Sequence, residues 1–287
     1  MADGDRVHPA GPGRDGGAVV AGMQCTRSAR GEFARAAAME WTRLASLRTT
    51  WWCLGIGAAA MAVFAVLMGI STADKIADDP ASASEFSYTR LTSQGVFYLL
   101  QFVVLTLAAL IATGEQANGG SAAALLVVPR RGRLLAARTA VTAGFAFATG
   151  TAVTALGIGV LRLVLGAGVP LEPEYVVRTV LGAGVCMALF AAMAVGLGTA
   201  LRSTAATIGV GLLLLLGVPM VLQLSATEWL NDLAAVFPGF AGIEFYASGD
   251  VGFYTAPHDG PVNAFTVLGW AAAAQLVGYA ESKARDA

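Results

Sequence analysis

The residues of this chain whose types could do chemistry gather in one segment, TGEQANGGSAAALLVVPRRGRLLAARTA, at residues 113–140. It combines one carboxylate with several glycines, a proline and a group of arginines. The residues of interest are Gly114, Glu115, Gln116, Gly119, Gly120, Pro129, Arg130, Arg131 and Arg133. Glycines allow sharp turns and close backbone approach. The charged groups suit ion pairing within the segment, or contact with anionic lipid or another protein. Arginines that merely flank membrane spans are the simpler alternative.

Catalytic chemistry has no comparable support. The two histidines are His8, in a Gly/Pro-rich arm, and His258, in a loop, and no metal-ligand spacing or G-x-S-x-G motif occurs. A P-loop needs Gly-Lys followed by Ser or Thr, but Lys75 precedes Ile76 and Lys283 precedes Ala284. We therefore predict a protein that is not an enzyme, has no ATPase site, and holds no metal or cofactor of its own.

The composition points to lipid as the solvent. Of 287 residues, 56% are hydrophobic and only 13% are charged, against roughly 25% charged residues in soluble domains. The net charge of -1 argues against nucleic acid as a partner. We expect a membrane protein in contact with lipid.

Charged residues mark the ends of six long uncharged stretches, each long enough to cross the roughly 30 Å hydrocarbon core as a helix. The predicted spans lie near 51–71, 95–113, 140–161, 178–200, 204–224 and 262–280. Because a backbone in lipid must satisfy its own hydrogen bonds, these stretches predict helices. The expected fold is therefore an all-α membrane protein with six transmembrane helices. Within the connector 225–261, the apolar stretch LAAVFPGFAGI is too short to span, and an interfacial, re-entrant or ordinary loop position stays open.

The positive charges are distributed unevenly between the two sides. With the N-terminus in the cytoplasm, 14 of the 18 Lys and Arg residues fall inside. The connector 225–261 has no Lys or Arg and carries five acidic residues. The positive-inside rule thus predicts a multi-pass protein with both termini, and the segment 113–140, in the cytoplasm.

The N-terminal region divides in two. Residues 1–30 are rich in Gly, Pro and Asp and predict a disordered cytoplasmic arm, followed by a six-span domain over 31–286. Ahead of the first span, a helical stripe places Phe33, Ala37, Trp41 and Leu44 together. We predict an amphipathic interfacial helix that uses Phe33, Trp41, Arg43, Leu44 and Arg48. A plain extension of the first span is the alternative.

Four motifs follow one another on this six-span layout: EWTRLASLRTTWW (40–52), TGEQANGG (113–120), PRRGRLLAAR (129–138) and GLGTALRSTAATIGV (196–210). Together they resemble the permease subunit of type-two ABC exporters, in the actinobacterial branch, over about residues 38–286. Two departures stand out: Gln116 replaces the family's Tyr, and Ala122 replaces a frequent Arg.

The resemblance implies a permease in the bacterial plasma membrane, paired as a homodimer or heterodimer. A separate ABC subunit would bind ATP, and a short helix at about Glu115 to Leu126 would dock on it as the coupling loop. The cargo would be amphiphilic or lipid-like and would move outward. A non-transporting scaffold, sensor or immunity protein of the same fold is the alternative function.

Overall fold

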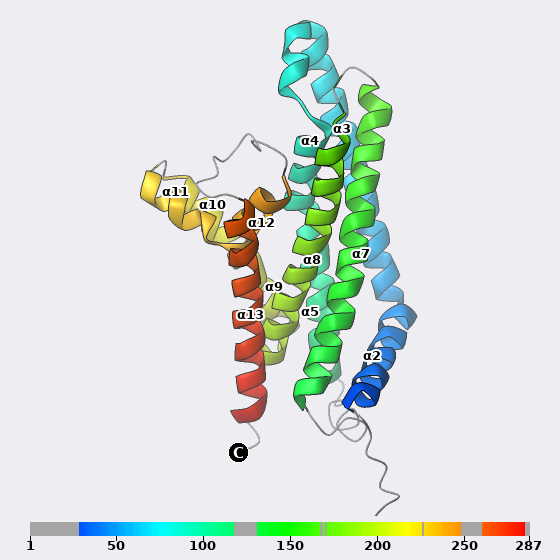
Figure 1. The fold of residues 1–287 in the computed structure, drawn as a ribbon, viewed down its shortest axis with the longest axis vertical. Helices are drawn as coiled ribbons and strands as arrows, with labels where there is room; N and C mark the ends of the chain where they lie inside the picture. The colour runs from blue at the N-terminus through cyan, green and yellow to red at the C-terminus, as the bar shows by residue number, and fades with distance from the viewer. Residues whose placement is uncertain are drawn as a thin grey trace, which may run out of the picture.

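The computed structural model describes residues 29–117, 131–166, 169, 171–225, 227–247 and 260–284. Among these residues every regular element is a helix and no strand occurs, which confirms the predicted all-α class. The predicted arm lies outside the described residues up to position 28. Most helices run along one long axis and form an elongated bundle (Figure 1).

Five helical stretches are long and apolar enough to cross a membrane, so the chain is a multi-pass helical membrane protein. They are Arg48–Asp78, Tyr88–Gly114, Gly132–Leu165, Pro173–Leu201 and Thr204–Gln223. The helices that form them are α3 (Arg48–Asp78), α4 (Tyr88–Gly95), α5 (Gln101–Ala117), α7 (Arg131–Leu165), α8 (Pro173–Leu201), α9 (Thr204–Leu212) and α10 (Val218–Gln223). These stretches correspond to the first five predicted spans.

The sixth predicted span, 262–280, falls within α13 (Gly260–Ala284), a helix of 25 residues. This helix is not among the five stretches that are apolar enough, and Asn263 and Gln275 are among the residues that lower its hydropathy. Both polar residues belong to the packed side of α13. Asn263 is buried, and Nε2 of Gln275 donates to the carbonyl of Ala192 at 2.6 Å while its Oε1 accepts from Thr139 at 3.1 Å.

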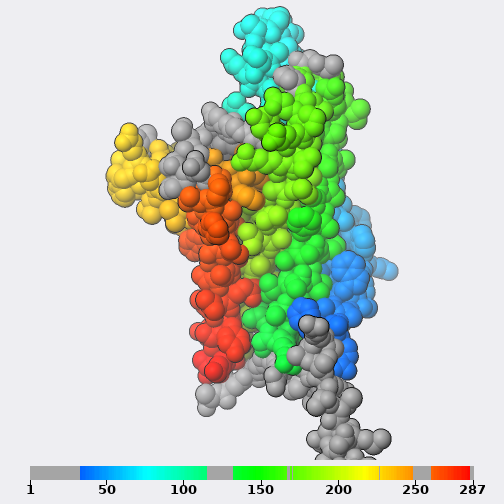
Figure 2. Space-filling view, in the orientation of Figure 1, coloured from blue at the N-terminus to red at the C-terminus, as the bar shows by residue number. Residues whose placement is uncertain are grey.

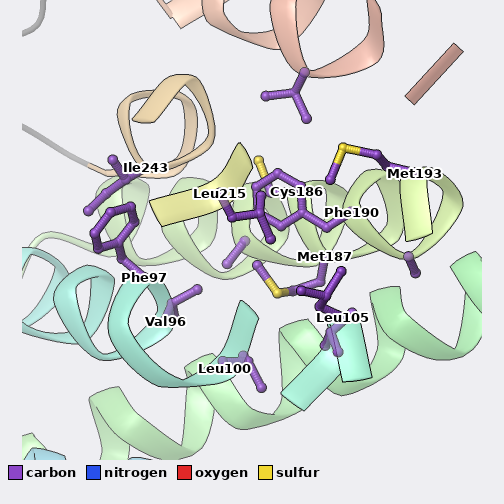
Figure 3. Packing of buried hydrophobic residues seen from close by; sticks show 14 of the residues in the cluster. Val96, Phe97, Leu100, Leu105, Cys186, Met187, Phe190, Met193, Leu215 and Ile243 are labelled. Carbon is purple, nitrogen blue, oxygen red and sulfur yellow. The ribbon is translucent and has the colours of Figure 1, made fainter. Parts of the chain in front are cut away.

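Helix α8 lies at the centre of the bundle, because it packs against α7, α13 and α5. Apolar side chains from α8, α5, the segment before α5 and shorter helices fill the space between them (Figure 3). The fully buried members shown there include Phe97, Leu105, Met187, Phe190 and Leu215. The burial of this apolar surface around α8 holds the surrounding helices together.

Helices α8 and α13 approach so closely that only glycine fits at the contact. A Cβ added to Gly196 would lie 2.5 Å from the carbonyl oxygen of Ala274, and one added to Gly278 would lie 2.6 Å from that of Gly196. Small residues of this kind let helix backbones pack directly in a membrane. Helix α13 is therefore an integral member of the bundle.

Two of the long helices contain a π-helical turn, at Val96–Leu100 and at Leu213–Gly217. The second turn is followed by Pro219, which has no N–H for the carbonyl of Leu215 one turn earlier. That carbonyl instead faces Gly239: a Cβ added there would lie 1.7 Å from the Leu215 oxygen. The glycine thus permits close backbone contact where the helix is distorted.

The connector 225–261 forms two short helices, α11 (Glu228–Ala235) and α12 (Pro238–Tyr246). The sequence left three positions open for the apolar stretch LAAVFPGFAGI. In the structure its second half belongs to α12, which packs on α13 and α8. Phe240 and Ile243 of this half are fully buried in the core. Helices α10 and α11 project sideways from the bundle (Figure 1). Trp229 of α11 is exposed there.

The two ends of the bundle differ in what they carry. One end holds α2 (Ala29–Ser46), the C-terminal turns of α5 and α13, and the first turns of α7 and α9 (Figure 1). We call it the α2 end. The opposite end holds the 3-10 helix η1 (Pro80–Glu85), the last turns of α3 and α7 and the first turns of α4 and α8, and we call it the η1 end.

Candidate functional site

The first part of the predicted chemical segment belongs to a helix. α5 continues through Ala117, so Gly114, Glu115 and Gln116 form its last turn at the α2 end. The predicted docking helix at about 115–126 thus begins as the end of α5. Positions 118–130, and with them Gly119, Gly120, Pro129 and Arg130, lie outside the described residues.

The segment closes in a second helix at the same end. α7 starts at Arg131 and carries Arg133 in its first turn. Gly132 lies close to α13, because a Cβ added there would be 3.3 Å from the ring of Tyr279. Residues 118–130 are therefore bounded by two long helices of the bundle, each anchored to a neighbour.

A buried ion pair joins α2 to α7 beside this segment. Nε of Arg138 donates to Oε1 of Glu40 at 3.0 Å, and Nη2 of the same arginine lies 3.0 Å from that oxygen. Both residues are buried, Glu40 at 2% exposure and Arg138 at 7%. Charge-assisted hydrogen bonds of this kind are short and strong, and a buried carboxylate without such a partner is costly. We call the pair the Glu40–Arg138 clamp.

A second arginine extends the contact to α5. Nη1 of Arg43 lies 3.8 Å from Oε2 of Glu40, and its side chain stays partly exposed. A Cβ added to Gly114 would lie 3.2 Å from Nη2 of the same arginine. The guanidinium of Arg43 therefore sits between α2 and the last turn of α5, and the three helices meet around one carboxylate.

The face that α2 turns to the bundle is the row Ala36, Glu40 and Leu44, all buried. Leu44 packs with Leu107 and Ile111 of α5. The residues of the predicted stripe therefore differ in burial. Leu44 is buried, Ala37 is half-buried, and Phe33 and Trp41 are exposed.

Three other predicted members of the interfacial helix, Phe33, Trp41 and Arg48, are exposed. Phe33 is 38% exposed, Trp41 is 54% exposed, and Arg48 is exposed at the start of α3. Trp51 and Trp52 of α3 are exposed as well. Helix α2 thus has one side packed on α7 and another that presents aromatic side chains.

The α2 end contains one further tie, between α5 and α9. The hydroxyls of Thr113 and Thr204 are 2.5 Å apart, and that of Thr113 also bonds the carbonyl of Ala109. Between α8 and α9 the chain turns at Arg202, which adopts a left-handed conformation, and Ser203 caps α9. The motif GLGTALRSTAATIGV accordingly forms a tight helical turn close to α5.

The described residues give no sign of catalytic chemistry at this end. Among them, no group of three His, Cys, Asp or Glu side chains could hold a metal ion. One interior cavity, between α3, α5, α7 and α8, measures about 10 Å³ and is lined almost entirely by apolar side chains. A space of this size holds about one water molecule. The charged contacts at this end therefore join α2, α5 and α7 around the Glu40 carboxylate.

The Glu40–Arg138 clamp was not predicted from the sequence. Glu40 was considered only as the first residue of the motif EWTRLASLRTTWW, and Arg138 was expected just outside the third span. The structure buries both side chains. A signal was present: Ala36, Glu40 and Leu44 are spaced by four, which puts a carboxylate in an otherwise apolar helical row. A carboxylate in such a row needs a partner of opposite charge.

No model of a known protein family matches the sequence, and no curated protein matches it.

Proposed function

We propose that this chain is the transmembrane permease subunit of an ABC exporter in a bacterial plasma membrane. A separate subunit binds and hydrolyses ATP, and the permease, as a homodimer or heterodimer, moves an amphiphilic or lipid-like substrate outward. The α2 end faces the cytoplasm in this proposal. The sequence contains no Gly-Lys-Ser/Thr P-loop, which agrees with an ATP-binding site on a separate subunit.

The sixth span of the proposed permease is α13. At 1.5 Å per residue, its 25 residues extend about 37 Å, which exceeds the roughly 30 Å of hydrocarbon. The hydrogen bonds of Gln275 to Ala192 and Thr139 satisfy its amide inside the bundle. Polar groups that bond within the bundle need not meet lipid, so a modest hydropathy is compatible with a spanning position.

Helix α2 is proposed to lie where the inner leaflet meets the cytoplasm. Its exposed Phe33 and Trp41, with Trp51 and Trp52 of α3, form an aromatic group at the α2 end. Tryptophan is enriched at the headgroup level of membranes. Arg43, Arg48 and Arg133 at the same end agree with the positive-inside rule.

The observation that carries the proposal is the Glu40–Arg138 clamp, which ties α2 to the first part of α7, the helix that follows residues 118–130 in the sequence. The loop between α5 and α7 is proposed to dock on the ATP-binding subunit. A push on it would act directly on the start of α7, and the clamp would make α2 move with α7. Since α7 packs along the central α8, the motion would pass into the bundle as a shift of packed helices.

The proposal is tested by co-expression of the chain with an ABC ATP-binding subunit encoded beside it. Deletion of residues 118–126 leaves the described part of α5 and α7 intact and should abolish co-purification. A matched control deletes residues 251–258, in the loop before α13, and should leave co-purification unchanged. Capture that survives the first deletion would reject the coupling loop. Capture without substrate-stimulated ATP hydrolysis in lipid would favour a non-transporting scaffold, sensor or immunity protein.

A further inference from the structure

A second site, separate from the α2 end, lies at the η1 end. It is a pocket of about 140 Å³ between the start of α4 and the start of α8. A single water molecule needs only roughly 10–15 Å³ by the same measure. The pocket is therefore large enough for a small organic group. Figure 2 shows the η1 segment and the neighbouring ends of the long helices together at this end of the molecule.

Three aromatic residues contribute to the lining: Phe86, Tyr88 and Tyr175. They come from both sides, the first two from the entry into α4 and the third from the first turn of α8. Aromatic faces carry partial negative charge and attract cations within about 6 Å of the ring centre. Groups of such rings are a recurrent way to bind an alkylated ammonium group.

The charge of the lining residues also favours a positively charged ligand. Among the described residues that line the pocket, Glu172 is the one carboxylate, and none is Lys, Arg or His. Glu172 precedes α8, and its side chain does not cap that helix. The lining therefore carries one negative charge, which favours a cation over a neutral or anionic ligand.

Four of the lining residues, Ser84, Ser87, Tyr88 and Thr89, have hydroxyl groups that already make hydrogen bonds. Tyr88 donates to the carbonyl of Gly166 at 2.7 Å, and Ser84 donates to the carbonyl of Ala81. The hydroxyls of Ser87 and Thr89 are 2.8 Å apart and bond each other. An anion would need free donors, and these bonds remove several of the candidates.

The cations near the pocket have their own partners. Arg162 donates to the Tyr88 hydroxyl and to the carbonyl of Gly166, and Lys75 lies 6.0 Å from the centre of the Phe86 ring. Neither residue lines the pocket. The Arg162 guanidinium also lies 5.6 Å from the centre of the Tyr88 ring, so each of these two rings already attracts a cation over one face.

We propose that this pocket binds an alkylated ammonium group, with Glu172 supplying the countercharge and Phe86, Tyr88 and Tyr175 the aromatic walls. The site stands independently of the transport proposal, because it is built from other residues at the opposite end of the bundle. The same ammonium chemistry is offered by a small soluble cation and by a choline lipid headgroup.

The test uses the full chain in phosphatidylglycerol nanodiscs, with tetramethylammonium as the probe. Saturation-transfer NMR on the probe methyl protons and calorimetry measure binding. Glu172→Gln should weaken binding by about tenfold or more, because it removes the countercharge while keeping the shape. Glu174→Gln, an exposed carboxylate two residues away that does not line the pocket, is the matched control and should bind as the wild type.

A second pair of variants distinguishes the loss of the aromatic ring from a loss of folding. Tyr175→Phe keeps an aromatic wall and should retain binding, whereas Tyr175→Leu should lose it, with all variants eluting as the same monodisperse species. Neutral 3,3-dimethylbutanol should bind far more weakly than the cation. Equal binding by wild type and Glu172→Gln, or no binding by the wild type, would overturn the proposal.

Nanodiscs of phosphatidylcholine then distinguish the two sources. If lipid headgroups reach the pocket, they compete, and tetramethylammonium binds more weakly than in phosphatidylglycerol. If affinity is the same in both lipids, the natural ligand is a soluble cation. Either result supports the site, provided that binding depends on Glu172.

Discussion

The two ends of the bundle each use an arginine of α7, in opposite ways. At the α2 end, Arg138 is buried and is neutralised by a carboxylate of another helix. At the η1 end, Arg162 donates to a phenol and a carbonyl, both neutral acceptors, close to the surface. A charge out of water needs a counterion, whereas one near water does not. The comparison teaches that α7 is held at the α2 end by an ion pair, and at the η1 end by hydrogen bonds from an arginine to neutral acceptors.

The largest effect is expected from breaking the clamp on one side. Glu40→Gln removes the carboxylate charge that the buried Arg138 contacts, and removal of one partner from a buried pair costs about 3–5 kcal/mol. The free energy of unfolding in detergent should fall by that amount. The double variant Glu40→Gln with Arg138→Gln should recover most of the loss, because both charges are gone. A double variant no more stable than Glu40→Gln alone would show that charge pairing is not what joins α2 to α7.

A smaller effect is expected from the backbone contact on the η1 side of the core. Gly239→Ala would place a methyl group 1.7 Å from the Leu215 carbonyl oxygen, so the π-turn or α12 must shift. Overpacking of this kind costs about 1–3 kcal/mol. Gly269→Ala on α13 is the control, since nothing lies within 4 Å of the added group, and it should be neutral or slightly stabilising. Thermal unfolding of both variants in the same detergent checks the difference.

The smallest effect is expected at Arg162. Tyr88→Phe removes one hydroxyl that bonds Gly166 and Arg162 but leaves the arginine bonded to the carbonyl of Gly166. The expected loss is about 1–2 kcal/mol, since two hydrogen bonds of roughly 0.5–1.5 kcal/mol each are removed. A loss as large as that of Glu40→Gln, measured in the same unfolding series, would erase the distinction between the two ends.

Helix positions were predictable because hydropathy and charge act locally along the chain. The first five predicted spans match helices apolar enough to cross a membrane, and the sixth falls within α13. The π-turn at Leu213–Gly217 was not predicted: Pro219 signals a distortion, but not its pairing with Gly239 in a distant helix. Likewise, the length of the apolar stretch LAAVFPGFAGI shows only that it is too short to span a membrane. Its burial depends on packing against side chains of other helices.

The site was predictable only in its position along the chain. The concentration of charge and glycine at 113–140 identified the segment between α5 and α7. The partner of Arg138 was not predictable in this way, because Glu40 is 98 residues away and ion pairs of this kind are formed by tertiary packing. The orientation of α2 shows the same limit: Trp41 and Leu44 share a helical stripe, yet only Leu44 meets α5.

The central claim is that the loop between α5 and α7 is on the cytoplasmic side, within reach of an ATP-binding subunit. The direct measurement is cysteine labelling with a membrane-impermeant maleimide, in a background with Cys25, Cys53 and Cys186 replaced. Ala124→Cys should react in inside-out vesicles and not in intact cells, and Ala81→Cys in η1 should show the reverse pattern. Labelling of Ala124→Cys from outside intact cells would contradict the account, because no cytoplasmic ATPase could then act on this loop.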